Sequence, residues 1–142
     1  MGFTKQTNIL THTGALAMLQ AAIAKAEELE RPQYITIVDH VGVPVVQFKM
    51  TGAKFLSRES ATSKAVTAAS NGAPSADVPE AVRPAIAAAT GGAVTGLAGG
   101  LPIIIEGELV GGIGIGSGTP DQDLAVARAA LQSIGADLFP SS

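Results

Sequence analysis

One short segment constrains this chain more than any other, because a glycine occupies every second position in it: Gly112, Gly114, Gly116 and Gly118. Side chains alternate across a β-strand, so a strand here carries no side chain on one face and Ile113 and Ile115 on the other. A bare strip of this kind allows another element to approach very closely. Either a helix packs tightly on the strip, or the strip forms the floor of a pocket for a flat ligand.

The glycine strip lies between signals for a hairpin and a helix. Leu101–Ile105 is a short apolar run, Glu106-Gly107 is a two-residue turn signal, and Leu109–Gly116 returns as the second strand. The sequence Thr119-Pro120-Asp121-Gln122 then fits the start of a helix, because Thr119 and Gln122 match a capping box and proline suits the first helical position. We expect this last helix to run to about Ala136.

Apolar spacing, caps and turn residues divide the rest of the chain. They predict helices over 11–30, 57–70 and 79–89, and strands over 34–39, 43–50 and 93–98. Ser57 is expected to cap the second helix, and Pro84 to kink or split the third. Together with the hairpin this gives five strands grouped between helices, which favours an α+β fold with an antiparallel sheet and helices packed on it. We expect one domain over residues 1–142, with residues 1–10 as a loose N-terminal arm.

Composition excludes several classes of function. The net charge is −3 without a basic cluster, which argues against nucleic-acid binding. The chain has no cysteine, and residues 1–10 lack the apolar core of a signal peptide, so we expect a cytoplasmic protein. Residues 84–105 carry no charge, but their glycines and prolines argue against a membrane span. The chain also has no Walker, GxSxG or HExxH motif and no complete GxGxxG.

Two long stretches resemble a known family. GGLPIIIEGELVGGIGIGSGTPDQD and ITIVDHVGVPVVQFKMTGAKFLSRESATSKAVTAA are similar to motifs of the GlcG/HbpS-like haem-degrading domain family, and LTHTGALAMLQAAIAKAEEL fits the first helix of that family. A similar domain forms the C-terminal part of PduO-type proteins. The resemblance implies a profilin-like fold, oligomers built from dimers and up to an octamer, and haem as the cofactor of some members.

The candidate haem ligands are the histidines and their neighbours in the sequence. His40 lies in the expected turn after the first strand and could be an axial haem ligand, a general base or an iron ligand, or simply an exposed turn residue. His12, at the start of the first helix, is the second candidate for haem or metal. Met50 could ligate haem or belong to the core, and Lys49 could pair with a propionate or be solvated. The strip Gly112, Gly114 and Gly116 would be the floor of such a site.

A second hypothesis makes the protein an enzyme. Lys64 lies among small residues of the second helix, where it could hold a carboxylate or phosphate, act as a base, or extend along the surface into solvent. Asp39 and His40 are the other catalytic candidates, although Asp39 also suits a turn that bonds its own backbone. The two hypotheses are therefore a small oligomeric protein that binds haem or a related flat ligand, and an enzyme of small-molecule catabolism that acts on an organic acid or ring compound by proton transfer or hydrolysis.

Overall fold

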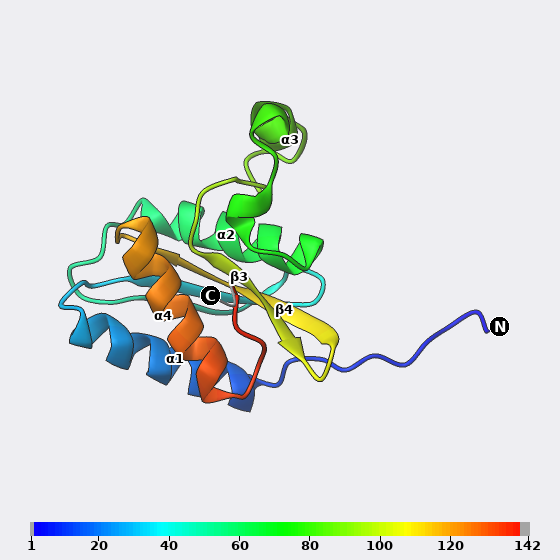
Figure 1. Ribbon diagram of the computed structural model, residues 1–142, viewed down its shortest axis with the longest axis horizontal. Helices are drawn as coiled ribbons and strands as arrows, with labels where there is room; N and C mark the ends of the chain where they lie inside the picture. The colour runs from blue at the N-terminus through cyan, green and yellow to red at the C-terminus, as the bar shows by residue number, and fades with distance from the viewer. Residues whose placement is uncertain (1, 140–142) are drawn as a thin grey trace.

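The computed structural model describes residues 2–139 and shows an α+β architecture built on one antiparallel sheet (Figure 1). Its strands lie in the order β2-β1-β4-β3, and helix α2 covers one face while α1 and α4 cover the other. The strands are β1 (Tyr34–Asp39), β2 (Pro44–Lys49), β3 (Gly100–Ile105) and β4 (Glu108–Gly116). The helices are α1 (His12–Glu28), α2 (Ser57–Asn71), α3 (Arg83–Ala89) and α4 (Pro120–Ser133), with short 3₁₀ turns η1 (Ser75–Asp77) and η2 (Glu80–Val82).

The sheet has four strands, so the prediction of five strands is wrong. The segment 93–98, expected to be a strand, has no strand partner because its backbone donors bond side chains. The amide of Thr95 donates to Thr67 Oγ1 at 3.0 Å, and the amide of Leu97 donates to Thr95 Oγ1 at 3.2 Å. These bonds satisfy both amides without a strand partner, and regular pairing begins only at Gly100.

The glycine strip of β4 lies directly beneath α2. A Cβ atom added to Gly112 would collide with the Ala65 carbonyl oxygen, and one added to Gly114 would collide with that of Ala61. At Gly116 an added Cβ would lie 3.0 Å from Ser57 Cβ. The backbone of α2 therefore occupies the space that side chains would need, as the helix-packing alternative predicted. A flat ligand could reach this strip only by displacing α2.

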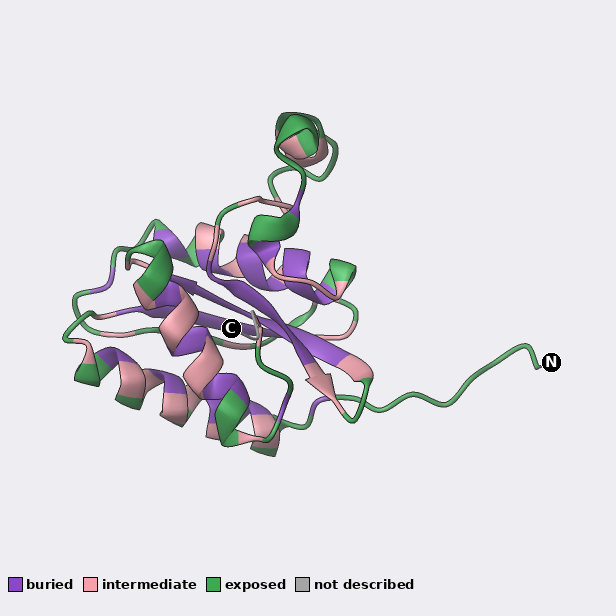
Figure 2. Cartoon of the chain, viewed as in Figure 1, coloured by how far each residue is buried: buried purple, intermediate pink, exposed green. Residues whose placement is uncertain are grey.

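The opposite face of the sheet carries the main core (Figure 2). Ile35 and Ile37 of β1 and Ile113 and Ile115 of β4 are fully buried there. They pack against alanines and a few larger residues of α1 and α4: Ala15, Met18, Ala22, Ala26, Val126, Ala127, Ala130 and Leu131. Small side chains on both helices let α1 and α4 pack closely against each other as well as on the sheet.

The helix ends test the predicted caps. Thr11 caps α1 through a 3.1 Å bond from the Gly14 amide, and Thr119 and Gln122 form the predicted capping box of α4. Ser57 does not cap α2: the cap position is Leu56, and the Ser57 hydroxyl accepts a 2.7 Å bond from Ser117 Oγ. The predicted helix at 79–89 is split into η2 and α3, as Pro84 suggested. None of the helices in residues 2–139 is both long and apolar enough to cross a membrane.

The N-terminal arm is less loose than expected. Residues 2–9 form no helix or strand, but Thr7 and Asn8 bond the carboxylate of Glu108 in β4. The Asn8 amide donates at 2.9 Å and its side chain at 2.6 Å. These bonds hold the pKa of Glu108 below its ordinary value, and they fix the arm at the point where it meets the sheet.

Candidate functional site

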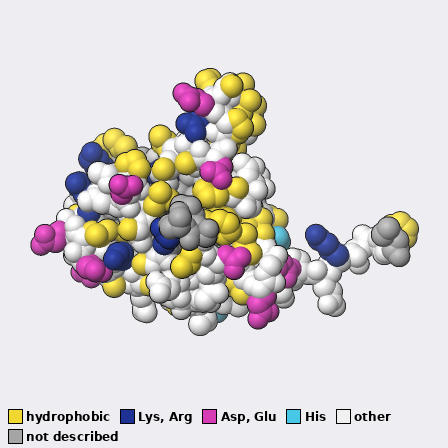
Figure 3. Space-filling model, in the orientation of Figure 1, with side chains coloured by type: hydrophobic (Ala, Val, Ile, Leu, Met, Phe, Trp, Pro, Cys, Tyr) yellow, Lys and Arg dark blue, Asp and Glu magenta, His cyan; other side chains and the backbone are white. Residues whose placement is uncertain are grey.

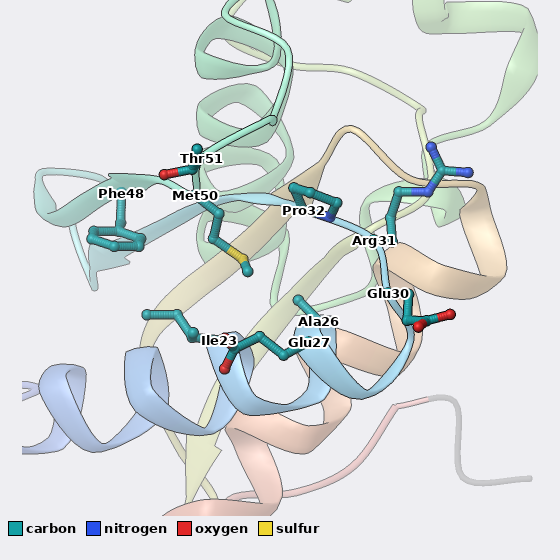
Figure 4. Close-up of a pocket in the computed structure, with 9 residues that line it drawn as sticks. All are labelled: Ile23, Ala26, Glu27, Glu30, Arg31, Pro32, Phe48, Met50 and Thr51. Carbon is teal, nitrogen blue, oxygen red and sulfur yellow. The ribbon is translucent and has the colours of Figure 1, made fainter.

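A cleft of about 580 Å³ separates the C-terminal half of α1 from the edge strand β2 (Figure 4). Its walls are mostly apolar, with a polar rim, and the residues that line it are Ile23, Ala26, Glu27, Glu30, Arg31, Pro32, Phe48, Met50 and Thr51. Pockets of a few hundred to a thousand Å³ with apolar walls and few polar groups are typical small-molecule sites. This cleft is our candidate binding site.

The alternation of β2 explains which side chains enter the cleft. Register pairs Phe48 with Ile35 of β1, so the Phe48 side chain shares the face of the sheet on which α1 lies. Met50 follows two residues later, on that same face. Figure 4 shows the Met50 side chain between Phe48 and α1, pointing into the cleft. The thioether sulfur accepts a 3.4 Å hydrogen bond from the Gln33 amide, and Met50 is half-buried against the edge of the main core.

The end of α1 forms the polar rim. Glu30 adopts a left-handed conformation with φ of 54°, and the Arg31 amide donates back to the Ala26 carbonyl at 3.0 Å, which turns the chain sharply toward Pro32. In Figure 4 the charged groups of Glu30 and Arg31 point away from Met50. With Glu27, the rim carries two carboxylates and one guanidinium. An anionic ligand group therefore meets one attractive charge and two repulsive ones.

Lys64, which the sequence offered as a catalytic or ligand-holding amine or as a surface lysine, lies in the interior. Its Nζ donates to the Ile115 carbonyl at 2.7 Å and to Asp123 Oδ2 at 3.1 Å, and the residue is 6% exposed. The second Asp123 oxygen accepts from the Gly118 amide at 3.0 Å. Burial raises the pKa of Asp123, and the Lys64 charge opposes that rise. This ion pair joins α2 to α4 across the sheet and does not line the cleft between α1 and β2.

Asp39 and His40 stay in the β1–β2 turn. Asp39 Oδ1 accepts bonds from the Val41 and Val43 amides at 3.0 Å each, so it closes its own turn. His40 is half-buried, and its Nδ1 is buried without a hydrogen-bond partner among the described residues. Asp39 makes its hydrogen bonds within the β1–β2 turn, whereas Lys64 of α2 bonds Ile115 of β4 and Asp123 of α4. The structure therefore does not assemble Lys64, Asp39 and His40 into one cluster.

The remaining predicted ligands are dispersed. His12 is exposed at the first position of α1, and Lys49 is exposed on β2 with its side chain alternating to the face opposite Met50. Within residues 2–139 no three His, Asp or Glu side chains come close enough to hold a metal ion. Metal binding by His40 and His12 stays a prediction. Of the sequence candidates, the cleft contains only Met50.

Sequence reasoning missed the other residues of the cleft and the partner of Lys64. The cleft could have been found from two patterns, the two-residue period of Phe48 and Met50 and the helical stripe that includes Ile23. Asp123 could have been suspected because a lysine placed among small residues of a buried helix needs a buried counter-charge. Nothing in the local sequence indicates that α1 and β2 would stand apart.

Fold and site together define a small α+β domain with an apolar cleft, in which Lys64, Asp39 and His40 do not form one cluster. A model of the family described as haem degrading protein HbpS-like matches residues 10–132, and the chain belongs to this family. It is 35% identical over 122 residues to the corrinoid adenosyltransferase PduO of Citrobacter freundii, covering 82% of this chain but only 36% of PduO. This chain thus spans about a third of that relative.

Two further comparisons cover nearly the full length of both proteins. A 15.0 kDa protein encoded between dhaT and dhaS in Citrobacter freundii is 32% identical over 142 residues, covering 92% of this chain and 96% of the relative. The crystal structure of a PduOC–haem complex superposes with a TM-score of 0.84 at 28% identity, covering 92% of this chain and 98% of that one. The family and this relative support haem as a cofactor for the fold.

Proposed function

We propose that this protein binds haem, or a related flat ligand, in the cleft between α1 and β2. The observation that carries the proposal is the Met50 thioether, which points into an apolar cleft of about 580 Å³. Methionine sulfur is one of the side-chain ligands that haem iron accepts in proteins. The PduOC–haem complex shows that a closely similar fold can hold this cofactor.

The residues of the cleft fit a porphyrin. Phe48 and Ile23 offer apolar surface on opposite walls, and Pro32 closes one end. Arg31 stands at the rim, where it can pair with a propionate that extends out of the cleft. When bound, haem would supply a redox-active iron; the chain itself supplies apolar contact, one soft ligand and one cation. His40 and His12 remain the alternative axial ligands, because they are the two imidazoles of the chain.

The finer features of the proposal follow the family resemblance. We propose a profilin-like fold in a cytoplasmic protein that works as a homo-oligomer. The central antiparallel sheet with helices on both faces supports the fold assignment. No observation favours the enzyme hypothesis, because Lys64 and Asp39 already use their polar atoms in contacts within the chain.

A haemin titration followed by visible absorption tests the proposal. Wild-type protein should bind haemin with a defined Soret band, and Met50→Leu should shift that band and weaken binding at least about tenfold while leaving the fold intact, since Leu and Met have similar volumes. His40→Ala and His12→Ala are the matched controls and should leave the band unchanged. If wild-type protein does not bind haemin, the proposed function is wrong. If only a histidine variant changes the band, haem binds but Met50 is not its ligand.

A further inference from the structure

A fully buried polar residue contacts the thioether of the cleft. Charged and hydrophobic side chains are interspersed over the face of the molecule that Figure 3 shows, whereas Gln33 is 0% exposed. Glutamine is mostly found at protein surfaces, so its complete burial calls for an explanation. Gln33 lies between Pro32, which lines the cleft, and Tyr34, which begins β1. It therefore connects the wall of the cleft to the central sheet.

Gln33 and Met50 make two reciprocal hydrogen bonds. The Met50 amide donates to the Gln33 carbonyl at 3.1 Å, and the Gln33 amide donates to Met50 Sδ at 3.4 Å. The first bond fixes the backbone of Met50, and the second fixes its side chain against the same residue. Methionine is an unbranched and flexible side chain, so a fixed donor on its sulfur selects among its rotamers. Gln33 thus sets the position of the sulfur.

The buried side chain of Gln33 keeps this backbone donor in place. A Cβ atom added to Gly118 would lie 2.6 Å from both Gln33 Nε2 and Asp123 Oδ1, so the carboxamide lies beside the carboxylate. Asp123 is itself held by Lys64 and by the Gly118 amide. The backbone at position 33 cannot shift without disturbing this buried group.

The contribution of Gln33 to the cleft comes from its backbone. Its Nε2 and Oε1 atoms are buried, and neither has a partner in hydrogen-bond geometry among residues 2–139. Burying an amide without partners costs free energy, so the carboxamide does not explain the residue through stability. The Gln33 N–H, by contrast, has a partner in the cleft, the Met50 sulfur.

This hydrogen bond also limits how the sulfur can bind a ligand. One lone pair of the thioether accepts the Gln33 N–H, which leaves the other for a further partner. Figure 4 shows the Met50 side chain between Phe48 and α1, pointing into the cleft. An iron atom in the cleft would therefore meet a sulfur that a backbone donor already holds.

We propose that Gln33 is a positioning residue of the haem site, whose amide orients the Met50 thioether and withdraws electron density from its sulfur. The inference rests on the proposed function, because it concerns the same haem ligand. Hydrogen bonds to a metal ligand orient that ligand and tune the metal, and they are one of the protein's levers on the potential of haem iron. A sulfur that shares a lone pair with an N–H is a weaker electron donor, so the contact favours ferrous iron.

Proline at position 33 tests the proposal, because proline has no N–H and is tolerated at the start of a strand. Gln33→Pro should weaken haemin binding at least about threefold, shift the Soret band and lower the reduction potential of the bound haem. In a Met50→Leu background the same change should have no further effect, since Gln33 acts through the sulfur. Equal effects of Gln33→Pro in both backgrounds would overturn the proposal. The matched control is Leu97→Pro, which removes a 3.2 Å bond from an amide to Thr95 Oγ1 and should keep wild-type haemin binding.

Amide hydrogen exchange followed by NMR tests the contact without haem and without a change at position 33, so it stays decisive if Gln33→Pro does not fold. Met50→Leu removes the acceptor and should speed exchange of the Gln33 amide at least about tenfold. The Ala53 amide, which donates to the Met50 carbonyl at 3.0 Å, is the internal control and should keep its rate. Normal haemin binding by wild type with unchanged exchange at Gln33 would overturn this inference alone. A wild type that does not bind haemin would overturn the proposed function and this inference with it.

Discussion

Two helices meet the same sheet in opposite ways. Helix α2 lies so close to β4 that its carbonyls occupy the positions of missing side chains at Gly112 and Gly114. Helix α1 packs mainly against α4, and its C-terminal half leaves an open cleft beside β2. One contact is backbone against backbone, and the other is a gap between side chains. The sheet therefore has one face that excludes ligands and one edge that can admit them.

The difference follows from the side chains of the two strands. Alternate glycines on β4 leave space for a helix, and the backbone of α2 at Ala61 and Ala65 fills the positions that side chains would need. At the end of β2, Phe48 and the following Met50 lie near the edge of the sheet, where neither α1 nor α4 fully covers them. A glycine strip, which suggested a ligand floor, is here the means of fixing a helix. The ligand site lies where side chains are large and partly uncovered.

Breaking the ion pair between Lys64 of α2 and Asp123 of α4 should have the largest effect on stability. Asp123→Ala leaves the Lys64 ammonium buried without a counter-charge and should lower the free energy of unfolding by about 3–5 kcal/mol. Urea denaturation measures this change. The double variant Lys64→Met with Asp123→Leu should recover most of the loss. A single variant within about 1 kcal/mol of wild type would show that the pair is not buried in solution.

A side chain on the glycine strip should have the next largest effect. Gly114→Val forces α2 off β4 and should cost up to about 3 kcal/mol, at the upper end of overpacking, because the colliding atoms belong to a backbone. Ile113→Val, on the opposite face of the same strand, is the control and should cost about 0.5–1.5 kcal/mol. Equal melting temperatures for Gly114→Val and wild type would show that α2 does not pack tightly on β4.

A substitution in the wall of the cleft should change stability little and haemin affinity more. Phe48 is 38% exposed, so Phe48→Ala should cost only about 1 kcal/mol of stability. It also removes apolar surface from the proposed haem site, and haemin affinity should fall more than stability does. Parallel melting curves and haemin titrations check this. A large loss of stability with unchanged haemin affinity would make Phe48 part of the core and not of a site.

Removing a charge at the rim of the cleft should change haemin affinity by a smaller factor, in opposite directions for the acidic and the basic residues. Glu27→Gln removes a repulsive carboxylate and should raise haemin affinity, whereas Arg31→Gln should lower it, each by about two- to fivefold, the range of exposed charge pairs. Both effects should shrink at high salt. Titrations at low and high ionic strength measure them. Shifts of the same sign in the two variants would mean that the propionates lie elsewhere.

The pH dependence of stability should identify the environment of Asp123. Burial raises its pKa above the ordinary 3.8, so the native state keeps a proton that the unfolded chain has already lost. This contribution is fully present below pH 3.8 and is lost as the pH rises through the native pKa of Asp123. The stability of wild type relative to Asp123→Asn should therefore fall as the pH increases over this window. A rise over the same range would mean that the Lys64 charge outweighs burial.

The sequence by itself determined most of the local structure. Thr119 and Gln122 fixed the start of α4, Glu106-Gly107 fixed the β3–β4 turn, and Pro84 split η2 from α3, because caps, turns and proline effects depend on residues only a few positions apart. Alternation also assigned Ile113 and Ile115 to the face opposite the glycines. The expected strand at 93–98 failed because its backbone amides donate to threonine side chains, one of which, Thr67, lies far away in the chain.

Only the tertiary structure decided what the strip and the charges do. No local pattern distinguishes a glycine face that receives a helix from one that receives a ligand, since both need the same absence of side chains. Whether Lys64 reaches a pocket or Asp123 depends on how α2 and α4 are placed on the two faces of the sheet. The cleft beside Met50 and the exposed position of α3 likewise depend on the distances between elements. Long-range packing sets these distances, and no local sequence pattern encodes them.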